Sequence, residues 1–370
     1  MIDVEPLVKT ALAEADAWDE HGLPPEAIRL AAHHGLLGLD RPVDLGGGGT
    51  SARELGDVTA ELGAVCSSLR ALTTVQGMVN AALDRWGTAE QRAEWLPQLV
   101  GGDRLAAVAC TEPGAGTDLS AVACEFRPGG GGDHRVYGRK LWVTFGEVAD
   151  VLLVLGRAPG GLVAGLVETD RAGVEIEPVT GQLGLRGARL AHVTLDGAAL
   201  PERQLIAPPG FGLSHVLGTA LDHGRYTVAW GCVGMARACL DEAVAHVRSR
   251  TQGGAPLGDH QTVRAALGRC AVTVRAAEEL CVRAAALRED GDPGSIVATV
   301  TAKYAAARAA ASVSAKAVQL LGAAGCAPGS AVARFFRDAK VMQIIEGADE
   351  VAEVMIGSHL LGLPHAGGAR

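Results

Sequence analysis

Hydrophobic and polar positions divide the chain into three stretches with different periodicity. Up to about residue 105, apolar residues recur at helical spacing, first after Pro24-Pro25, which suits an opening helical turn, and again over residues 55–69. Between residues 106 and 207, apolar positions alternate, as over 121–126, or form short runs such as 151–155. Short strands separated by Gly and Pro predict a β-barrel or β-sandwich in this middle stretch.

Helical spacing returns after residue 208. Two amphipathic stripes precede helices predicted at about 295–321 and from about Val332 onward, which together predict an antiparallel four-helix bundle. The first stripe consists of Cys232, Met235, Cys239, Leu240, Ala243, Val244 and Val247. We therefore expect an α+β, mostly α, fold with an N-terminal helical domain (1–105), a middle β-domain (106–207) and a C-terminal four-helix bundle (208–370).

Composition and charge narrow the classes of function. A formal net charge of −9 argues against nucleic acid or an anionic membrane as a partner, because both bind basic surfaces. The sequence shows no secretion signal and no run of about 20 apolar residues, so we expect no membrane span. The eight cysteines form no C-x-x-C pair, which predicts reduced, mostly buried thiols in a cytoplasmic protein and no metal site.

The segment TEPGAGTD at residues 111–118 is the most distinctive local pattern. Its two threonine hydroxyls lie on a backbone containing Gly114 and Gly116, which would let main-chain N–H groups approach a planar ligand or a phosphate. An ordinary Gly-Pro surface turn is the alternative. The chain has no G-x-G-x-x-G, P-loop or G-x-S-x-G motif, so we expect neither a Rossmann nucleotide site nor a nucleophile elbow.

Two further blocks follow this segment in order: KLWVTFG at 140–146, then RDAK at 337–340 with IIEG at 344–347. Together the three blocks resemble the acyl-CoA dehydrogenase family of flavoproteins, whose usual forms read T-E-P-x-A-G-S-D, W-I-T-N, and R-D-A with E-G-T. The resemblance extends over most of the chain, roughly to Leu363. It implies an FAD-dependent dehydrogenase of acyl thioesters, and amino-acid side chains alone could not accept the hydride.

The match of Glu346-Gly347 to the family's E-G-T implies that Glu346 is the catalytic base, with Gly347 beside the substrate. Local sequence leaves two possibilities for Glu346, burial behind an apolar pair, which would raise its pKa, or a place on a solvated acidic face. Some family members carry the base on an earlier helix, where this chain has Gly224, which cannot accept a proton. Asp222 and Arg225 match a family pair beside the substrate, although an ion pair within one helix would also explain them.

The resemblance also assigns cofactor contacts. Thr111 and Thr117, with Gly116 in the same loop, match positions that contact the flavin ring and the pyrophosphate. Trp142 and Thr144 match positions that flank the isoalloxazine, although Trp142 could instead be a core residue of the β-domain.

In this family a neighbouring subunit also grips the FAD, which implies a homo-oligomer, either a dimer or a tetramer. Arg250 matches the arginine in that role, and the family's A-V-Q-x-x-G-G segment corresponds here to Gln319, Gly322 and Ala323. An exposed charge at a helix end is the alternative interpretation of Arg250.

Four departures from the family pattern bear on the substrate. Gly253 stands where Phe is common, Ala348 replaces the usual Thr, Ile345 often corresponds to Tyr, and residues 323–326 read AAGC instead of a form of G-G-x-G-Y. They leave FAD expected but count against ordinary fatty-acid β-oxidation. The overall resemblance favours a branch that oxidises a short hydroxylated acyl group on an acyl carrier protein, for hydroxymalonyl or methoxymalonyl polyketide extender units.

Other functions remain open at this point. The first is a conventional acyl-CoA dehydrogenase that passes electrons to an electron-transferring flavoprotein. The second is a flavin monooxygenase or oxidase on the same fold, and the third is a non-catalytic helical scaffold. An acidic carrier protein would need a basic docking patch, for which the candidates are Arg186, Arg189, Arg248, Arg334 and Arg337.

Overall fold

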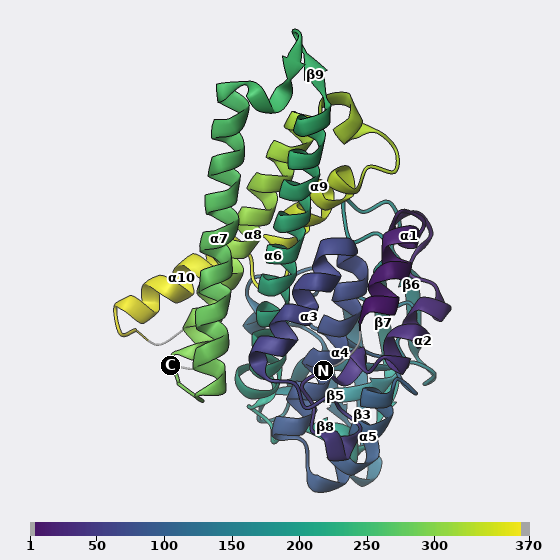
Figure 1. The fold of residues 1–370 in the computed structure, drawn as a ribbon. Helices are drawn as coiled ribbons and strands as arrows, with labels where there is room; N and C mark the ends of the chain where they lie inside the picture. The colour runs from purple at the N-terminus through teal and green to yellow at the C-terminus, as the bar shows by residue number, and fades with distance from the viewer. Residues whose placement is uncertain (1–3, 364–370) are drawn as a thin grey trace.

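The N-terminal helices lie between the β-sheet and the long C-terminal helices (Figure 1). The computed structural model describes residues 4–363, so the outer ends of the first and last predicted domains lie outside it. The helices are α1 (Glu5–His21), α2 (Pro25–His33), α3 (Ala52–Val65), α4 (Ser67–Trp86) and α5 (Ala89–Gly101). Capping boxes begin α3, at Ser51 and Glu54, and α5, at Thr88 and Gln91.

The helical period predicted over residues 55–69 is interrupted at one residue. Cys66 adopts an extended conformation, with φ of −154°, between the end of α3 and the start of α4. The break redirects the chain without disturbing the apolar spacing, so periodicity alone could not reveal it. As a result α3 and α4 are separate helices, and both pack against α6 of the bundle.

The middle of the chain forms one eight-stranded sheet. In sequence the strands are β1 (Ala106–Ala109), β2 (Glu125–Pro128), β3 (His134–Val143), β4 (Val151–Ala158), β5 (Gly161–Glu168), β6 (Val174–Pro178), β7 (Ala191–Leu200) and β8 (Leu205–Ile206). The order across the sheet is β6-β7-β3-β2-β4-β5-β8, and β1 pairs in parallel with β4. The strand predicted at 121–126 begins only at Glu125, because residues 119–121 form a 3₁₀ turn.

Both faces of strand β4 are buried. Leu152 and Val154 belong to a small core enclosed by the sheet itself, whereas Leu153 and Leu155 join the large core shared with the helices. A short apolar run without alternation is the pattern expected of a strand covered on both sides. The sheet is therefore anchored to the helical layers through its central strand.

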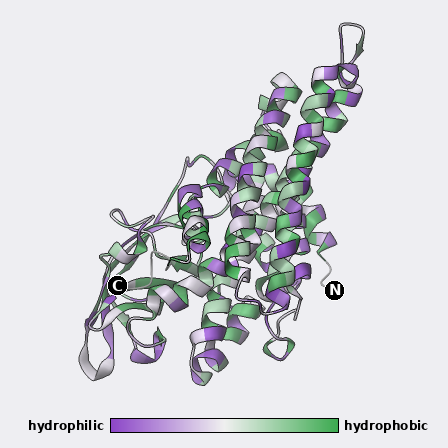
Figure 2. Ribbon diagram, turned by 90° about the vertical axis from the view of Figure 1, so that its left-hand side faces the viewer, coloured by the Kyte–Doolittle hydropathy of each residue, from purple (hydrophilic) through white to green (hydrophobic). Residues whose placement is uncertain are grey.

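The C-terminal helices are α6 (Gly218–Ser249), α7 (Gln261–Glu289), α8 (Ser295–Leu321), α9 (Ala331–Met342) and α10 (Asp349–Leu360). Their polar and apolar residues are interspersed (Figure 2). α7 buries one face, whereas α6 is buried on all sides over residues 226–236. A hairpin of β9 (Thr251–Gln252) and β10 (Ala255–Pro256) caps the end of the bundle far from the sheet (Figure 1). The α+β, mostly α, fold is confirmed, but the predicted fourth helix is interrupted at residues 343–348.

The remaining structural expectations concern cysteines, metals and membranes. All eight cysteines are free, six of them are buried, and only Cys326 is exposed, as predicted for reduced thiols. Within residues 4–363, no group of His, Cys, Asp and Glu side chains could hold a metal ion. None of the helices in this range is long and apolar enough to cross a membrane.

Candidate active site

Glu346 lies in the break between α9 and α10. Its backbone is left-handed, with φ of 56°, and Gly347 follows with φ of 95°. Two successive residues of this kind end a helix, and Asp349 N–H then donates to Gln343 O (3.0 Å) as α10 begins. A side chain in the left-handed region is strained, which is common where function requires a fixed position.

Two cations, the buried Lys303 and the half-buried Arg225, hold this break in place. Arg225 Nε donates to Glu346 O (2.9 Å) from α6, and Lys303 Nζ donates to Gly347 O (2.7 Å) from α8. Burial lowers the pKa of Lys303 and of Arg225, and the charge of Glu346 acts in the opposite direction on both. The backbone of the loop is thus fixed by residues from two other helices.

Glu346 is half-buried as a residue, but one of its carboxyl oxygens, Oε2, is fully buried. Its Oε2 has no hydrogen-bond partner among the described residues. Burial raises the pKa of Glu346, and Arg225, Lys303 and Arg70 oppose the rise. A β-carbon built at Gly224 would lie 2.8 Å from Glu346 Cδ and Oε2, so a glycine on α6 leaves room for the carboxyl. The solvated acidic face considered for Glu346 is therefore wrong.

The 111–118 loop follows strand β1 and is anchored by its glutamate. Glu112 accepts hydrogen bonds from Lys140 Nζ (2.6 Å) and from the backbone N–H of Ala123 (2.6 Å), and Lys140 is fully buried. Glu112 N–H also donates to Ala115 O (2.8 Å), which closes a tight turn. The loop contains the Gly-Pro turn considered from the sequence, and this turn leaves Gly116 and Thr117 exposed.

Trp142 lies beside this loop at the end of β3. The Leu141 N–H donates to Thr111 O (2.8 Å), which joins the two segments. Trp142 has a left-handed backbone, with φ of 57°, and its side chain is 52% exposed, so its assignment to the core is wrong. An exposed indole next to half-buried Thr144 and the exposed loop fits a planar flavin ring with its phosphates.

The loop and the carboxylate lie within electrostatic range of each other. Burial raises the pKa of the Cys110 thiol at the end of β1, and the charge of Glu346 adds to that rise. Since Cys110 directly precedes Thr111, the start of the predicted cofactor loop lies near the predicted base.

The other predicted cofactor residues lie elsewhere. Arg250 ends α6 next to β9, Gln319 lies in the last turn of α8, and Gly322 and Ala323 follow it. This end of the bundle is remote from the sheet (Figure 1), and all four residues are exposed. One chain therefore does not bring them to Trp142, and their shared role stays a prediction that requires a second subunit.

Of the predicted substrate residues, Asp222 lies apart from Arg225 and Gly347. Asp222 forms an ion pair with Arg288 of α7, so the alternative of an ion pair with Arg225 within one helix is wrong. Arg225 turns instead toward the Glu346 carbonyl. A small pocket is lined by Arg225, Glu346 and Gly347 together with Val300, Lys303, Val351, Ala352 and Met355.

The five arginines considered for a basic docking patch differ in their surroundings. Three of the five are neutralised within the chain, and Arg334 is buried. Only Arg186 and Arg248 are exposed. The neutralised arginines form the ion pairs Arg189–Glu147, Arg334–Asp16 and Arg337–Asp19.

Sequence reasoning missed three buried polar residues near Glu346. Lys303 and Arg70 are cations with mostly apolar neighbours in their helical segments, and this was the available signal. Arg70 contacts Thr74 Oγ1 (3.0 Å) and Met342 Sδ (3.2 Å). The third, His223, precedes Gly224 on α6 and carried no distinctive pattern.

Comparisons with known proteins cover nearly the whole chain. Residues 3–103, 107–198 and 210–361 match the N-terminal, middle and C-terminal domains of acyl-CoA dehydrogenase. The mitochondrial short-chain specific acyl-CoA dehydrogenase of Mus musculus is 30% identical over 92% of this chain and 84% of its own. The glutaryl-CoA dehydrogenase of Desulfococcus multivorans is 31% identical over 95% and 92%.

A solved structure shows the same arrangement. FkbI, described as acting in biosynthesis of the methoxymalonyl extender unit of the polyketide FK520, is 39% identical, covers 97% of this chain and 99% of its own, and superposes with a TM-score of 0.90. Three matched domains and this coverage establish the family. The chain therefore belongs to the acyl-CoA dehydrogenase family of FAD-dependent oxidoreductases.

Proposed function

We propose that this enzyme oxidises a short, hydroxylated acyl thioester bound to an acyl carrier protein, with Glu346 as the base that removes the α-proton. The observation that carries the assignment of the base is the buried carboxyl oxygen of Glu346 that has no hydrogen-bond partner. Burial raises the pKa of Glu346, which favours a base that works near neutral pH. FAD, when bound, supplies the hydride acceptor that no side chain can replace.

The residues around Glu346 have separate tasks in this proposal. Arg225 and Lys303 bind the backbone carbonyls of residues 346 and 347, and so fix the direction of the carboxyl. Their positive charges also stabilise the carboxylate and limit the rise of the Glu346 pKa. Gly224 leaves space for the carboxyl, and Trp142 offers the face against which a flavin would rest.

The proposed substrate rests on sequence similarity to known proteins. The 39% identity to FkbI over nearly the full length of both chains supports an acyl group of the extender-unit kind, held by a carrier protein. A conventional α,β-desaturation of acyl-CoA, with electrons passed to an electron-transferring flavoprotein, is the alternative. The 30% identity to a short-chain specific acyl-CoA dehydrogenase supports that alternative.

Anaerobic mixing of the purified holoenzyme with candidate thioesters tests the proposal. We expect a 3-hydroxypropionyl or glyceryl group on a carrier protein to bleach the flavin absorbance faster than butyryl-CoA. Faster bleaching by butyryl-CoA would establish the conventional dehydrogenase instead. Reduced enzyme that oxidises rapidly in air would favour an oxidase or a monooxygenase, and colourless protein would favour a non-catalytic scaffold.

A further inference from the structure

Arg70 of α4 is a buried cation without a carboxylate beside it. The residue is 2% exposed, and no carboxylate within residues 4–363 forms an ion pair with it. Its Nη1 donates to Thr74 Oγ1 (3.0 Å), and its Nη2 contacts Met342 Sδ (3.2 Å). Both partners are neutral, and a buried charge is costly unless an opposite charge compensates it. The guanidinium of Arg70 must therefore be compensated from a greater distance.

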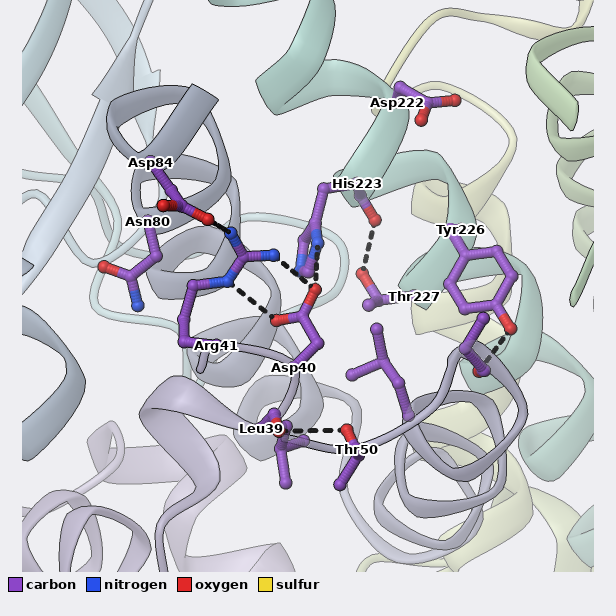
Figure 3. Close-up of polar contacts among 12 residues, drawn as sticks. Leu39, Asp40, Arg41, Thr50, Asn80, Asp84, Asp222, His223, Tyr226 and Thr227 are labelled. Atoms are coloured by element: carbon purple, nitrogen blue, oxygen red, sulfur yellow. Dashed lines mark hydrogen bonds and ion pairs between the residues drawn. The ribbon is translucent and has the colours of Figure 1, made fainter. Parts of the chain in front are cut away.

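Arg41 shows how a mostly buried arginine is accommodated elsewhere in this chain. Its side chain is 12% exposed and contacts the carboxylates of Asp40 (2.7 Å) and Asp84 (2.8 Å), as Figure 3 shows. The positive charge there has negative charges in direct contact. Arg70 is more deeply buried and lacks such contacts, so its charge is free to act on a more distant group.

Hydrogen bonds lead from Arg70 toward the proposed base along the seam between α4 and α6. The Thr74 Oγ1 that accepts from Arg70 lies 3.0 Å from Thr227 Oγ1 on α6. The Thr227 hydroxyl donates to His223 O (3.2 Å), as Figure 3 shows, and to Gly224 O (3.1 Å). Because Gly224 packs against the carboxyl of the proposed base, this series of hydrogen bonds ends beside that group.

Two glycines on one face of α6 set the distance between the two charged groups. A β-carbon built at Gly231 would lie 2.9 Å from Arg70 Cδ, and one built at Gly224 would lie 2.8 Å from Glu346 Cδ. Seven residues make nearly two helical turns, so the two glycines share a face and are about 10 Å apart along the helix. The guanidinium and the carboxyl therefore lie in the same protein interior, roughly 10 Å from each other.

Charged and titratable groups reach Glu346 from several elements. Burial raises its pKa, and Arg225 of α6, Lys303 of α8 and Arg70 of α4 oppose the rise. The Cys110 thiol at the end of β1 stays neutral, because burial raises its pKa. Arg225 and Lys303 donate to backbone carbonyls of the loop that contains the base, whereas the hydrogen bonds of Arg70 go to residues outside that loop. Arg70 therefore acts on Glu346 through its charge.

Arg70 has acidic neighbours of its own. Burial lowers the pKa of its guanidinium, and four groups oppose the fall: Cys232, Glu346, Asp338 and Cys66. The two thiols stay neutral, because burial raises their pKa. Of the two carboxyls, Asp338 accepts a hydrogen bond from the Leu185 N–H (2.7 Å), whereas Glu346 Oε2 has no partner among the described residues. Glu346 therefore depends more strongly on nearby positive charge.

We infer that Arg70 is a positioning residue for the proposed base, and that its positive charge keeps the Glu346 carboxylate ionised so that it can accept the α-proton. The inference rests on the role proposed for Glu346 and adds to it a residue outside the lining of the pocket. A positive charge stabilises the ionised form of a carboxyl and lowers its pKa. At a distance of about 10 Å and an effective dielectric constant of about 20, the interaction corresponds to a shift of roughly one pH unit.

The pH profile of flavin reduction tests this inference. Holoenzyme carrying Arg70→Met is mixed anaerobically with a saturating concentration of a 3-hydroxypropionyl thioester on a carrier protein. We expect the pH of half-maximal reduction to rise by roughly one unit above that of wild type, because the base then lacks one of its three cations. The limiting rate at high pH and the half-saturating substrate concentration should stay within about threefold of wild type, because Arg70 does not line the pocket.

Infrared spectroscopy gives a second readout that needs no substrate. The carboxylic-acid band that is absent from Glu346→Gln belongs to the proposed base, and its titration should move upward in Arg70→Met by the same amount. Arg41→Met is the matched control, because it removes an arginine whose charge is already compensated, and it should lose stability without moving either midpoint. Arg70→Gln, also neutral, takes the place of Arg70→Met if that variant does not fold.

An unmoved midpoint in folded, flavin-loaded Arg70→Met overturns the inference. A rate lowered equally at every pH also overturns it, because a purely structural role would produce that result. Neither outcome touches the proposed base as long as Glu346→Gln reduces flavin slowly. If Glu346→Gln reduces flavin as fast as wild type, the proposed base and the inference fall together.

Discussion

Replacing Gly224 with alanine should displace the carboxyl of Glu346, the proposed base, while leaving its chemistry unchanged. The new β-carbon would lie 2.8 Å from Glu346 Cδ and Oε2 and 3.0 Å from Met78 Sδ. Carbon atoms pack at roughly 3.5–4.0 Å, so the carboxyl must retreat by about 0.7–1.2 Å. A displacement of about 1 Å at a reacting group lowers the rate by roughly 10²-fold, and we expect a loss of about 10- to 100-fold in flavin reduction.

Stability should change much less than rate. Alanine in a helix interior gains about 0.5–1 kcal/mol over glycine, and overpacking costs about 1–3 kcal/mol. The net destabilisation of Gly224→Ala is then about 0–2.5 kcal/mol. Stopped-flow bleaching at saturating substrate measures the rate of flavin reduction. The flavin content shows whether the variant binds FAD, and thermal unfolding measures its stability. Gly268→Ala, whose β-carbon meets nothing within 4 Å, is the control. Reduction within twofold of wild type in folded, flavin-loaded Gly224→Ala would refute the assignment.

Three further predictions concern the base, the loop and the cofactor surface. Glu346→Gln should lower flavin reduction by at least about 10²-fold if Glu346 is the base. Because burial raises the pKa of Glu346, the folded state binds this proton more tightly than the unfolded chain, so stability is lost as pH rises from about 4.3 through the folded pKa. Glu346→Gln should therefore melt above wild type at pH 8 but not at pH 4, and equal melting at both would contradict the sign. Lys140→Met leaves Glu112 buried without its counter-charge and should destabilise by about 3–5 kcal/mol in urea unfolding. The exposed neighbour Arg139, changed to Met, should cost less than about 1 kcal/mol, and similar losses in both would refute a special role for the buried pair. Trp142→Ala should weaken FAD binding to the apoprotein roughly 10-fold with little change in apoprotein melting, because the indole is exposed; unaltered FAD affinity would remove Trp142 from the cofactor site.

Periodicity predicted the three-part layout because long amphipathic helices and short apolar strands differ in the spacing of their apolar residues. It failed where the backbone changes direction without a change in that spacing. Cys66 is extended between two helices that read as one, and residues 343–348 interrupt a segment predicted as continuous. In the second case the left-handed Glu346 is responsible, and only Gly347 marked the position in the sequence.

The candidate site could be predicted in part. The family resemblance assigned both Thr111 and Trp142 to the flavin, and the structure joins their segments through the bond from Leu141 N–H to Thr111 O. For Glu346 the local sequence offered a buried carboxyl as one of two possibilities, and Oε2 is buried. Lys303 reaches the site from a distant helix, and its contact with Gly347 O arises only when that helix packs. Charge partners were predicted least well, because Asp222 pairs with a residue of another helix rather than its own.

The left-handed backbone at Glu346 has a consequence for laboratory evolution. This position combines a strained conformation, which costs about 1 kcal/mol or more, with a carboxyl that is buried and incompletely hydrogen-bonded. A glycine would relieve both costs, and a screen for heat resistance alone would favour that change. Selection of mutant libraries for thermostability will therefore tend to replace Glu346, the proposed base, unless each round also selects for turnover.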